Sequence, residues 1–222
     1  YTNDDATISY KYKKPNDPKP ENPTKHYNKP IIKVKEKDTG YLKVYKGFVG
    51  FGDKLYNKDT QEWTTLGKDV LKKVNFDVYM QMQNGQEKLI TRVNLGDERW
   101  INSKFDSTKT YQLDNGYVLN ILPAEVGVPD TRNDNKKYEG HRFVFEIDNL
   151  PKNLKYKVVE DMTGKEQVYK VDNYSYQYSG NDLLRKRDLT EEYNKMPATP
   201  SSNPNGNVYS FNNFYKLTEG NI

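Results

Sequence analysis

Three segments of the sequence each place one polar residue among apolar residues that alternate as they do in a half-buried β-strand. The segments are residues 42–48, 154–160 and 208–216, and their polar residues are Lys46, Glu160 and Asn213. Side chains two positions apart in a strand point to the same side, so each polar residue shares its side with apolar or aromatic neighbours. Burying an isolated charge costs considerable free energy. An amine, an acid and an amide that all point into one interior therefore suggest a joint chemical role.

The chemistry that suits these three residue types is the formation of an amide bond between two side chains. Burial favours the neutral amine of Lys46 and the neutral acid of Glu160. A neutral amine can attack the side-chain carbonyl of Asn213, while Glu160 polarises that carbonyl and moves protons. Ammonia leaves, and an isopeptide bond remains. The alternative is that Lys46 extends to a strand end and that Glu160 and Asn213 only hydrogen-bond to the backbone.

The elements that must position these residues are predicted to be strands. Alternating runs separated by turn residues predict strands over residues 41–49, 75–82, 87–94, 110–113, 117–122, 141–147, 155–160, 167–171 and 207–216. Their spacing without helical crossovers indicates an all-β protein with an antiparallel β-sandwich. Residues 67–74 and 181–196 interrupt this pattern, because their composition favours a short helix.

The chain is predicted to consist of a linker and one large domain. Residues 1–39 contain an alternating run at 7–13, which we interpret as the end of a preceding module, and four prolines among charges at 13–23. Such a Pro-rich segment forms no core and behaves as an extended spacer. The alternative is a disordered end of the chain. We expect the β-sandwich to span residues 40–222.

Composition excludes several classes of function. The 35 Lys and Arg are interspersed with 31 Asp and Glu, so the net charge is only +4, and no nucleic-acid contact is expected. The chain has no Cys and two His, and we expect neither a metal nor another cofactor. No apolar run is long enough to span a bilayer, so this segment is expected to make no membrane contact. No group of residues supports a turnover enzyme.

The three segments also match a family pattern. They read GYLKVYKGFVG over residues 40–50, FEIDNLPKNLKYKVVED over 145–161 and VYSFNNFYK over 208–216. In this order they resemble the first strand, the Asn-Leu-Pro region with its following Tyr-x-Val-x-Glu strand, and the last strand of the collagen-adhesin B-type (CnaB) domains. These domains occur in surface proteins and pilins of Gram-positive bacteria. The resemblance implies that Lys46 is the nucleophile, Glu160 the catalytic acid and Asn213 the amide partner.

The resemblance has two departures. About 100 residues separate the first strand from Asn-Leu-Pro, which implies insertions, and the insertion at 172–206 is also unusual. Asn212 lies beside Asn213, and a shift of one residue in register would exchange the sides to which they point. Lys43 is the less suitable nucleophile, because it shares its side with Tyr45.

The expected function is therefore that of an immunoglobulin-like, CnaB-like structural module that is locked by an isopeptide bond. The resemblance implies an extracellular location on a bacterial cell wall, with any signal and anchor outside this segment, and neighbouring modules as partners. The alternative is an adhesin module that binds a host protein or glycan through inserted loops at 51–74, 123–140 and 172–206. A binding module should show a concave patch built by those loops, and a pure spacer should not.

Overall fold

The structure is a computed structural model, and it describes residues 6–9, 24–27, 39–130, 133–152, 154–161, 168–181, 194–195 and 208–218. The chain divides into two compact units, Tyr1–Lys37 and Asp38–Ile222. In the first unit, strand β1 (Ala6–Ser9) pairs antiparallel with β2 (Thr24–Tyr27). Strand β1 overlaps the run that we interpreted as a strand at 7–13. The remainder of the predicted Pro-rich spacer lies outside the described residues.

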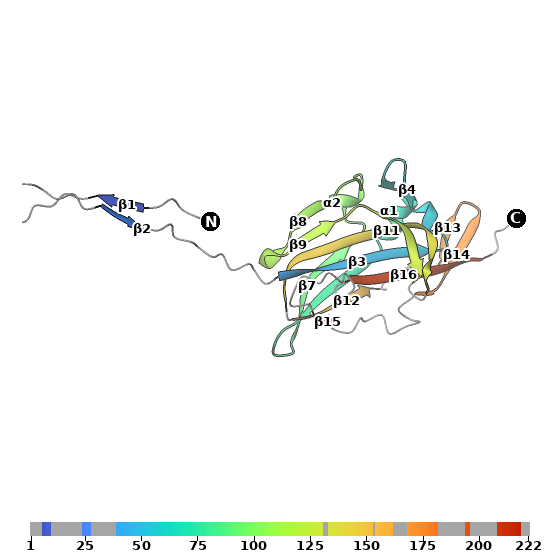
Figure 1. The fold of residues 1–222 in the computed structure, drawn as a ribbon. Coiled ribbons are helices and arrows are strands. Elements are labelled where there is room, and N and C mark those ends of the chain that lie inside the picture. Colours follow the sequence, from blue (N-terminus) through green and yellow to red (C-terminus); the bar gives the residue numbers. More distant parts are fainter. Residues whose placement is uncertain are drawn as a thin grey trace, which may run out of the picture. The chain divides into compact units, whose positions relative to one another are not determined.

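The second unit contains two sheets that form the predicted β-sandwich (Figure 1). The large sheet has the order β13 (Val168–Val171), β14 (Tyr174–Asn181), β16 (Val208–Thr218), β3 (Thr39–Val49), β11 (Asn133–Pro151), β9 (Val118–Ile121) and β8 (Lys109–Gln112). Strand β10 (Glu125–Asp130) pairs with the first half of β11. The small sheet has the order β15 (Asn194–Lys195), β12 (Lys155–Asp161), β6 (Asn75–Gln81) and β7 (Glu87–Asn94). The all-β fold class is thus confirmed.

The core lies between these two sheets and is rich in aromatic rings. Phe76 of the small sheet packs against Phe145 and Phe211 of the large sheet, with ring centroids 5.8 and 4.9 Å apart. Buried residues of β3 occur at every second position from Leu42 to Phe48, as the alternation predicts. The same rule buries one side of β12, whereas β16 is buried on both sides from Phe211 to Tyr215.

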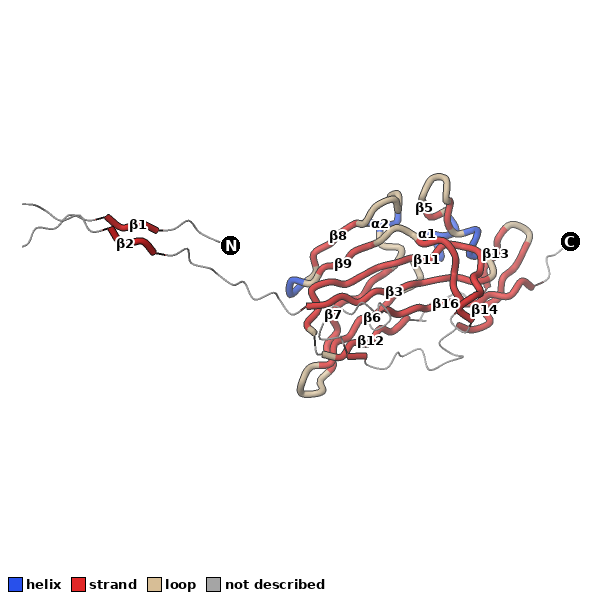
Figure 2. Tube along the Cα trace, viewed as in Figure 1, coloured by secondary structure: helices blue, strands red, loops and turns tan. Residues whose placement is uncertain are grey.

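The helices are short, and Figure 2 shows them as small segments among the strands. Helix α1 (Thr65–Leu71) overlaps the predicted segment 67–74 and begins after Thr64, whose hydroxyl accepts a hydrogen bond from the Gly67 N–H. Helix α2 (Glu98–Ile101) was not predicted; it is capped by the side chain of Asp97. Short one-turn elements are η1 (Gly52–Lys54) and η2 (Asp114–Gly116), and β4 (Tyr56–Asn57) pairs with β5 (Glu62–Trp63). Most of the helix expected at 181–196 lies outside the described residues.

Two features of the sheets differ from the sequence-based expectation. The first and last strands of the domain, β3 and β16, pair in parallel, whereas all other described pairs are antiparallel. A parallel pair needs a long connection, and almost the whole domain lies between these strands. In addition, parts of the predicted loops 123–140 and 172–206 are strands, namely β10, the start of β11, and β14.

Candidate functional site

Three strands bring Lys46, Asn213 and Glu160 together in the core between the sheets. Lys46 lies on β3 and Asn213 on the neighbouring strand β16, in the large sheet. In the register of this parallel pair, Lys46 lies opposite Phe211 and Asn213 lies opposite Phe48. Both polar side chains are therefore on the inner side of the sheet, because Lys46 and Phe48, like Phe211 and Asn213, are two positions apart. Glu160 extends from β12 of the facing sheet.

One carboxylate oxygen connects the other two residues. Glu160 Oε1 lies 2.8 Å from Lys46 Nζ and accepts a hydrogen bond of 3.1 Å from Asn213 Nδ2. Lys46, Glu160 and Asn213 are only 1%, 3% and 0% exposed. An ion pair in such a position has lost almost all its hydration, which favours transfer of the lysine proton to the carboxylate.

Aromatic rings enclose these three side chains. Lys46 Nζ lies 4.9 Å from the centre of the Phe48 ring. Phe76 is the register partner of Glu160 on the neighbouring strand, and it packs against Phe211. These rings are fully buried and exclude water from around the polar groups. In a dry site of this kind, electrostatic interactions are much stronger than they are in water.

Tyr215 adds a polar group to the same side of β16 as Asn213. Burial raises the pKa of its phenol well above the ordinary value, and Tyr169 and the charge of Glu160 raise it further. Tyr215 therefore stays protonated at any physiological pH. Tyr215 is two positions from Asn213, so the period of the strand places both on one side, but no role was predicted for Tyr215.

The amide of Asn213 has two orientations with different chemistry. In the orientation described above its Nδ2 faces Glu160, and its Oδ1 is buried with no hydrogen-bond partner in the described part of the chain. Rotation of the amide by half a turn directs Oδ1 to Glu160 instead. A protonated Glu160 can then donate a hydrogen bond to that oxygen, as an acid that polarises the carbonyl must.

The two neighbouring residues that could be confused with the site residues point to the other side of the large sheet. Lys43 Nζ lies 3.6 Å from Glu146 on this outer side. Asn212 Nδ2 donates a hydrogen bond of 2.9 Å to the backbone carbonyl of Pro129 on β10. Asn212 thus connects β16 to β10 by a hydrogen bond on the outer side. The sequence could not predict this role, because it placed residues 123–140 in a loop.

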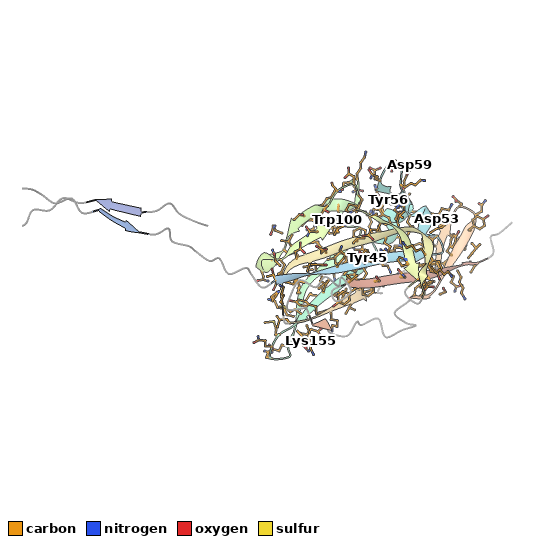
Figure 3. The ribbon with its side chains drawn as sticks, viewed as in Figure 1. Tyr45, Asp53, Tyr56, Asp59, Trp100 and Lys155 are labelled. Carbon is orange, nitrogen blue, oxygen red and sulfur yellow. The ribbon has the colours of Figure 1, made fainter. Side chains whose placement is uncertain are left out.

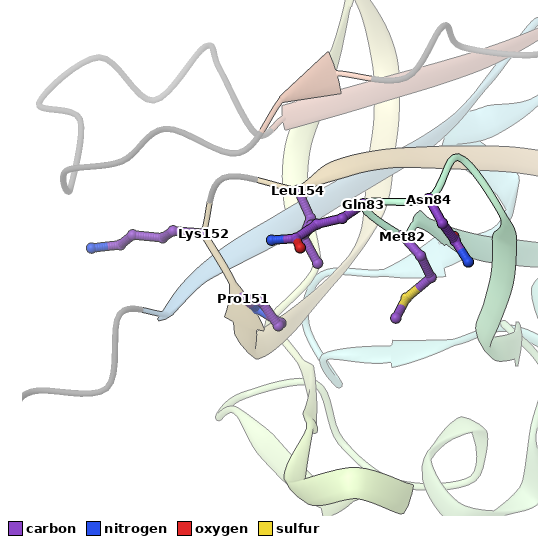
Figure 4. A pocket seen from close by; sticks show the side chains of 6 residues that line it. All are labelled: Met82, Gln83, Asn84, Pro151, Lys152 and Leu154. Atoms are coloured by element: carbon purple, nitrogen blue, oxygen red, sulfur yellow. The ribbon is translucent and has the colours of Figure 1, made fainter.

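The clefts in the described part of the second unit include two that lie away from the buried site residues. The first, of about 520 Å³, lies between the β6–β7 turn and the β11–β12 turn and is shown in Figure 4. Its lining includes Met82, Pro151, Lys152 and Leu154. The second, of about 740 Å³, lies between residues 53–64 and the β10–β11 hairpin. Neither cleft includes any of the three buried site residues.

The described residues contain no group of three His, Asp or Glu side chains that could hold a metal ion. None of the described helices is long and apolar enough to cross a membrane. Comparisons of this chain with protein-family models, with curated proteins and with solved structures found no match.

Proposed function

We propose that this chain is a structural module of a Gram-positive cell-surface adhesin or pilin, and that it forms an isopeptide bond between Lys46 and Asn213 without another enzyme. The observation that carries this proposal is the position of Glu160 Oε1, which is within hydrogen-bonding distance of both the lysine and the amide nitrogen. A proton shuttle must reach exactly these two atoms, the attacking nitrogen and the leaving one.

The reaction begins with transfer of the Lys46 proton to Glu160. The neutral Nζ then attacks Cγ of Asn213, whose carbonyl is polarised by the protonated Glu160. As the tetrahedral intermediate collapses, Glu160 delivers a proton to Nδ2, and ammonia leaves. As the amide forms, Nζ gives its second proton to Glu160, which therefore ends protonated. One C–N bond forms and one breaks, and no oxidant or cofactor takes part.

The fold supplies what an external enzyme would otherwise provide. The parallel pairing of β3 and β16 fixes both reactants on one side of one sheet, so that the bimolecular reaction becomes intramolecular. The surrounding Phe48, Phe76 and Phe211 keep water away from the intermediate. The reaction occurs once in each molecule, so the module is not a turnover enzyme.

The absence of cysteine fits a surface location. A covalent tie at the cell surface can be a disulfide, but this chain has no Cys. An amide bond between two side chains also cross-links the chain covalently, and reductants do not break it. The three CnaB-like segments of the sequence supply the link to Gram-positive surface proteins, in which neighbouring modules of the same protein are the expected partners.

Intact mass tests this proposal directly. The purified, denatured protein is expected to lack the mass of one ammonia relative to its sequence. Lys46→Ala and Asn213→Ala should each restore the full sequence mass. Lys43→Ala is the matched control, since Lys43 lies on the same strand but on the outer side, and it should keep the deficit. A wild-type mass equal to that of the plain sequence would contradict the proposal.

A second function, ligand binding, is favoured by a separate observation. The cleft of about 740 Å³ is lined by residues from two of the three segments proposed as binding loops, 51–74 and 123–140. Its volume lies in the range of small-molecule sites. Binding at this cleft is compatible with a structural role for the core, because the two sites share no residue.

A further inference from the structure

The cleft between residues 53–64 and the β10–β11 hairpin has two walls that pack directly on each other. Gly140 has a φ of +122°, and a side chain there would bring its Cβ within 2.8 Å of the Gly52 backbone. The rings of Tyr56 and His141 lie 4.4 Å apart across the same boundary. Figure 3 shows Asp53 and Tyr56 at this end of the domain. The cleft is thus formed before any ligand arrives.

Some polar residues of the cleft hold its shape and are engaged within the protein. Asn57 Oδ1 accepts hydrogen bonds from the N–H groups of Asp59 and Thr60. Thr64 donates to the Lys54 carbonyl and caps α1. These contacts fix the loop backbone and leave other side chains to face a ligand.

The side chains that face a ligand carry balanced charge. Asp53 and Lys54 lie on one wall, where Asp53 Oδ2 is 3.5 Å from Lys54 Nζ. Lys58 also lines the cleft. Glu139 and His141 lie on the opposite wall. Burial and the charge of Lys58 lower the pKa of His141 below 6.5, so the imidazole is neutral at pH 7. The carboxylates of Asp53 and Glu139 balance the ammonium groups of Lys54 and Lys58. The cleft therefore has no net charge that would attract a strongly charged ligand.

A ligand for this cleft must offer both hydrogen-bond donors and acceptors. The carboxylates of Asp53 and Glu139 only accept, the Lys58 ammonium only donates, and a neutral imidazole does both. Hydroxyl groups satisfy all of these partners without carrying charge. Apolar surface makes up more of the lining than polar surface does, and it includes Val126, which is 72% exposed, and Gly127, so the ligand must also offer an apolar side. A largely apolar ligand would leave the many polar groups of the walls unsatisfied.

We propose that the cleft lined by Asp53, Lys58, Val126, Glu139 and His141 binds a neutral saccharide. The ring hydroxyls hydrogen-bond to the carboxylates, the ammonium and the imidazole, while the C–H side of the sugar ring packs on Val126 and Gly127. This inference rests on the second proposed function, ligand binding at this cleft. It does not depend on the isopeptide bond, because the cleft and the buried site share no residue.

The test uses the whole chain and a panel of methyl glycosides of glucose, galactose and N-acetylglucosamine, with N-sulfated glucosamine as a charged comparator. Amide chemical shifts are followed during titration with each sugar. At least one neutral sugar is expected to shift amides of residues 52–58 and 126–141. Asp53→Asn and Glu139→Gln should each weaken that binding about tenfold, which corresponds to the loss of one good hydrogen bond to a charged group, about 1.4 kcal/mol.

Asp114→Asn is the control, since it removes an exposed carboxylate from η2, outside the cleft. It should leave the titration unchanged. The dispersion of amide shifts reports whether each variant is folded. The proposal is overturned if no neutral sugar shifts these amides, or if the two cleft variants bind as tightly as the control. Binding of the sulfated sugar alone would also overturn it.

Discussion

Glu160 differs from the other carboxylates of this domain because both nitrogens of the proposed reaction contact the same one of its oxygens. We predict that Glu160→Gln stops bond formation, because an amide cannot take the proton from Lys46 and return it to the leaving nitrogen. Glutamine nearly preserves the volume of glutamate, so the packing should change little. Intact mass should therefore show no ammonia loss.

The control for this prediction is Glu146→Gln, the same substitution at a half-buried carboxylate on the outer side of the large sheet. It should retain the ammonia deficit of the wild type. If Glu160→Gln also lost ammonia at the wild-type rate, a different carboxylate would have to act as the proton shuttle.

Glu146 itself leads to a pH-dependent prediction. Burial, a hydrogen bond with Asp148 and the charge of Asp148 raise the pKa of Glu146 to about 7, and Lys43 opposes this effect. The pKa in the folded state is therefore above the ordinary value of 4.5. The contribution of protonated Glu146 to the free energy of unfolding is fully present below pH 4.5. It is lost as the pH rises to about 7.

Glu146→Gln imitates the protonated group, and it should stabilise the domain above pH 7 by about 1 kcal/mol after allowance for solvent screening and for the lost contact with Lys43. Near pH 4.5 the gain should vanish. Urea unfolding at the two pH values measures the difference, with the exposed Asp114→Asn as a control that should show no such dependence. A gain of equal size at both pH values would contradict the raised pKa.

At the scale of elements, the approach of β16 to β3 determines whether the reactants meet. Gly50, directly after β3, has a φ of +119°, and a Cβ there would lie 2.3 Å from the carbonyl oxygen of Tyr215. We predict that Gly50→Ala pushes β16 away near Asn213 and reduces the cross-linked fraction. Mass analysis at successive times after cell-free synthesis measures that fraction.

Gly180→Ala is the matched control for this prediction. Gly180 has a similar φ of +127°, but a Cβ there would meet no atom within 4 Å. Both variants carry similar backbone strain, and only Gly50→Ala adds a clash with β16. Equal cross-linking in the two variants would show that the contact with Tyr215 does not position the reactants.

The elements that carry the site were predictable from the sequence because a strand has a side-chain period of two. That period predicted β3, β12 and β16 to within about two residues at each end, and with them the sides on which Lys46, Glu160 and Asn213 lie. It contains no information on strand direction, so the parallel pairing of β3 with β16 was not predicted.

Strand β10 was missed for a different reason. Gly127 and Pro129 interrupt the alternation of β10, and the register shifts at two points along its pairing with β11. Such irregular strands resemble loops in sequence. The segments 51–74 and 123–140 were named as loops that could form a binding patch, and both line the cleft. Its shape depends on how the β10–β11 hairpin meets residues 53–64, and no local sequence pattern determines that contact.

For the whole domain, the parallel arrangement determines how tension passes through it. The chain enters β3 at Thr39 and leaves β16 at Thr218, so the two points lie at opposite ends of neighbouring strands (Figure 1). Tension between these points would shear β3 against β16. An amide bond between Lys46 and Asn213 would transmit this force directly from one strand to the other. The part of the chain between these two residues would then not be stretched. This path suits a module in a surface stalk.

The last prediction concerns the contribution of this tie to stability. A cross-link that closes about 170 residues stabilises by about 5 kcal/mol in the chain-entropy model. Single variants would confuse this contribution with the cost of an unpaired buried charge. The double variant Lys46→Met/Glu160→Gln removes both charges at similar volume and prevents the bond. We expect its melting temperature to fall by roughly ten degrees.

The matched control is Lys157→Met/Glu87→Gln, which removes a pair of the same residue types with an N–O distance of 2.7 Å on the surface of the small sheet. Surface ion pairs contribute about 0–1 kcal/mol, so this variant should melt within a few degrees of the wild type. Calorimetry compares the two, and mass spectrometry confirms which of them carry the bond. If both double variants had the same melting temperature, the Lys46–Asn213 bond would contribute nothing measurable to thermal stability. A mechanical role for this bond would then have to be abandoned.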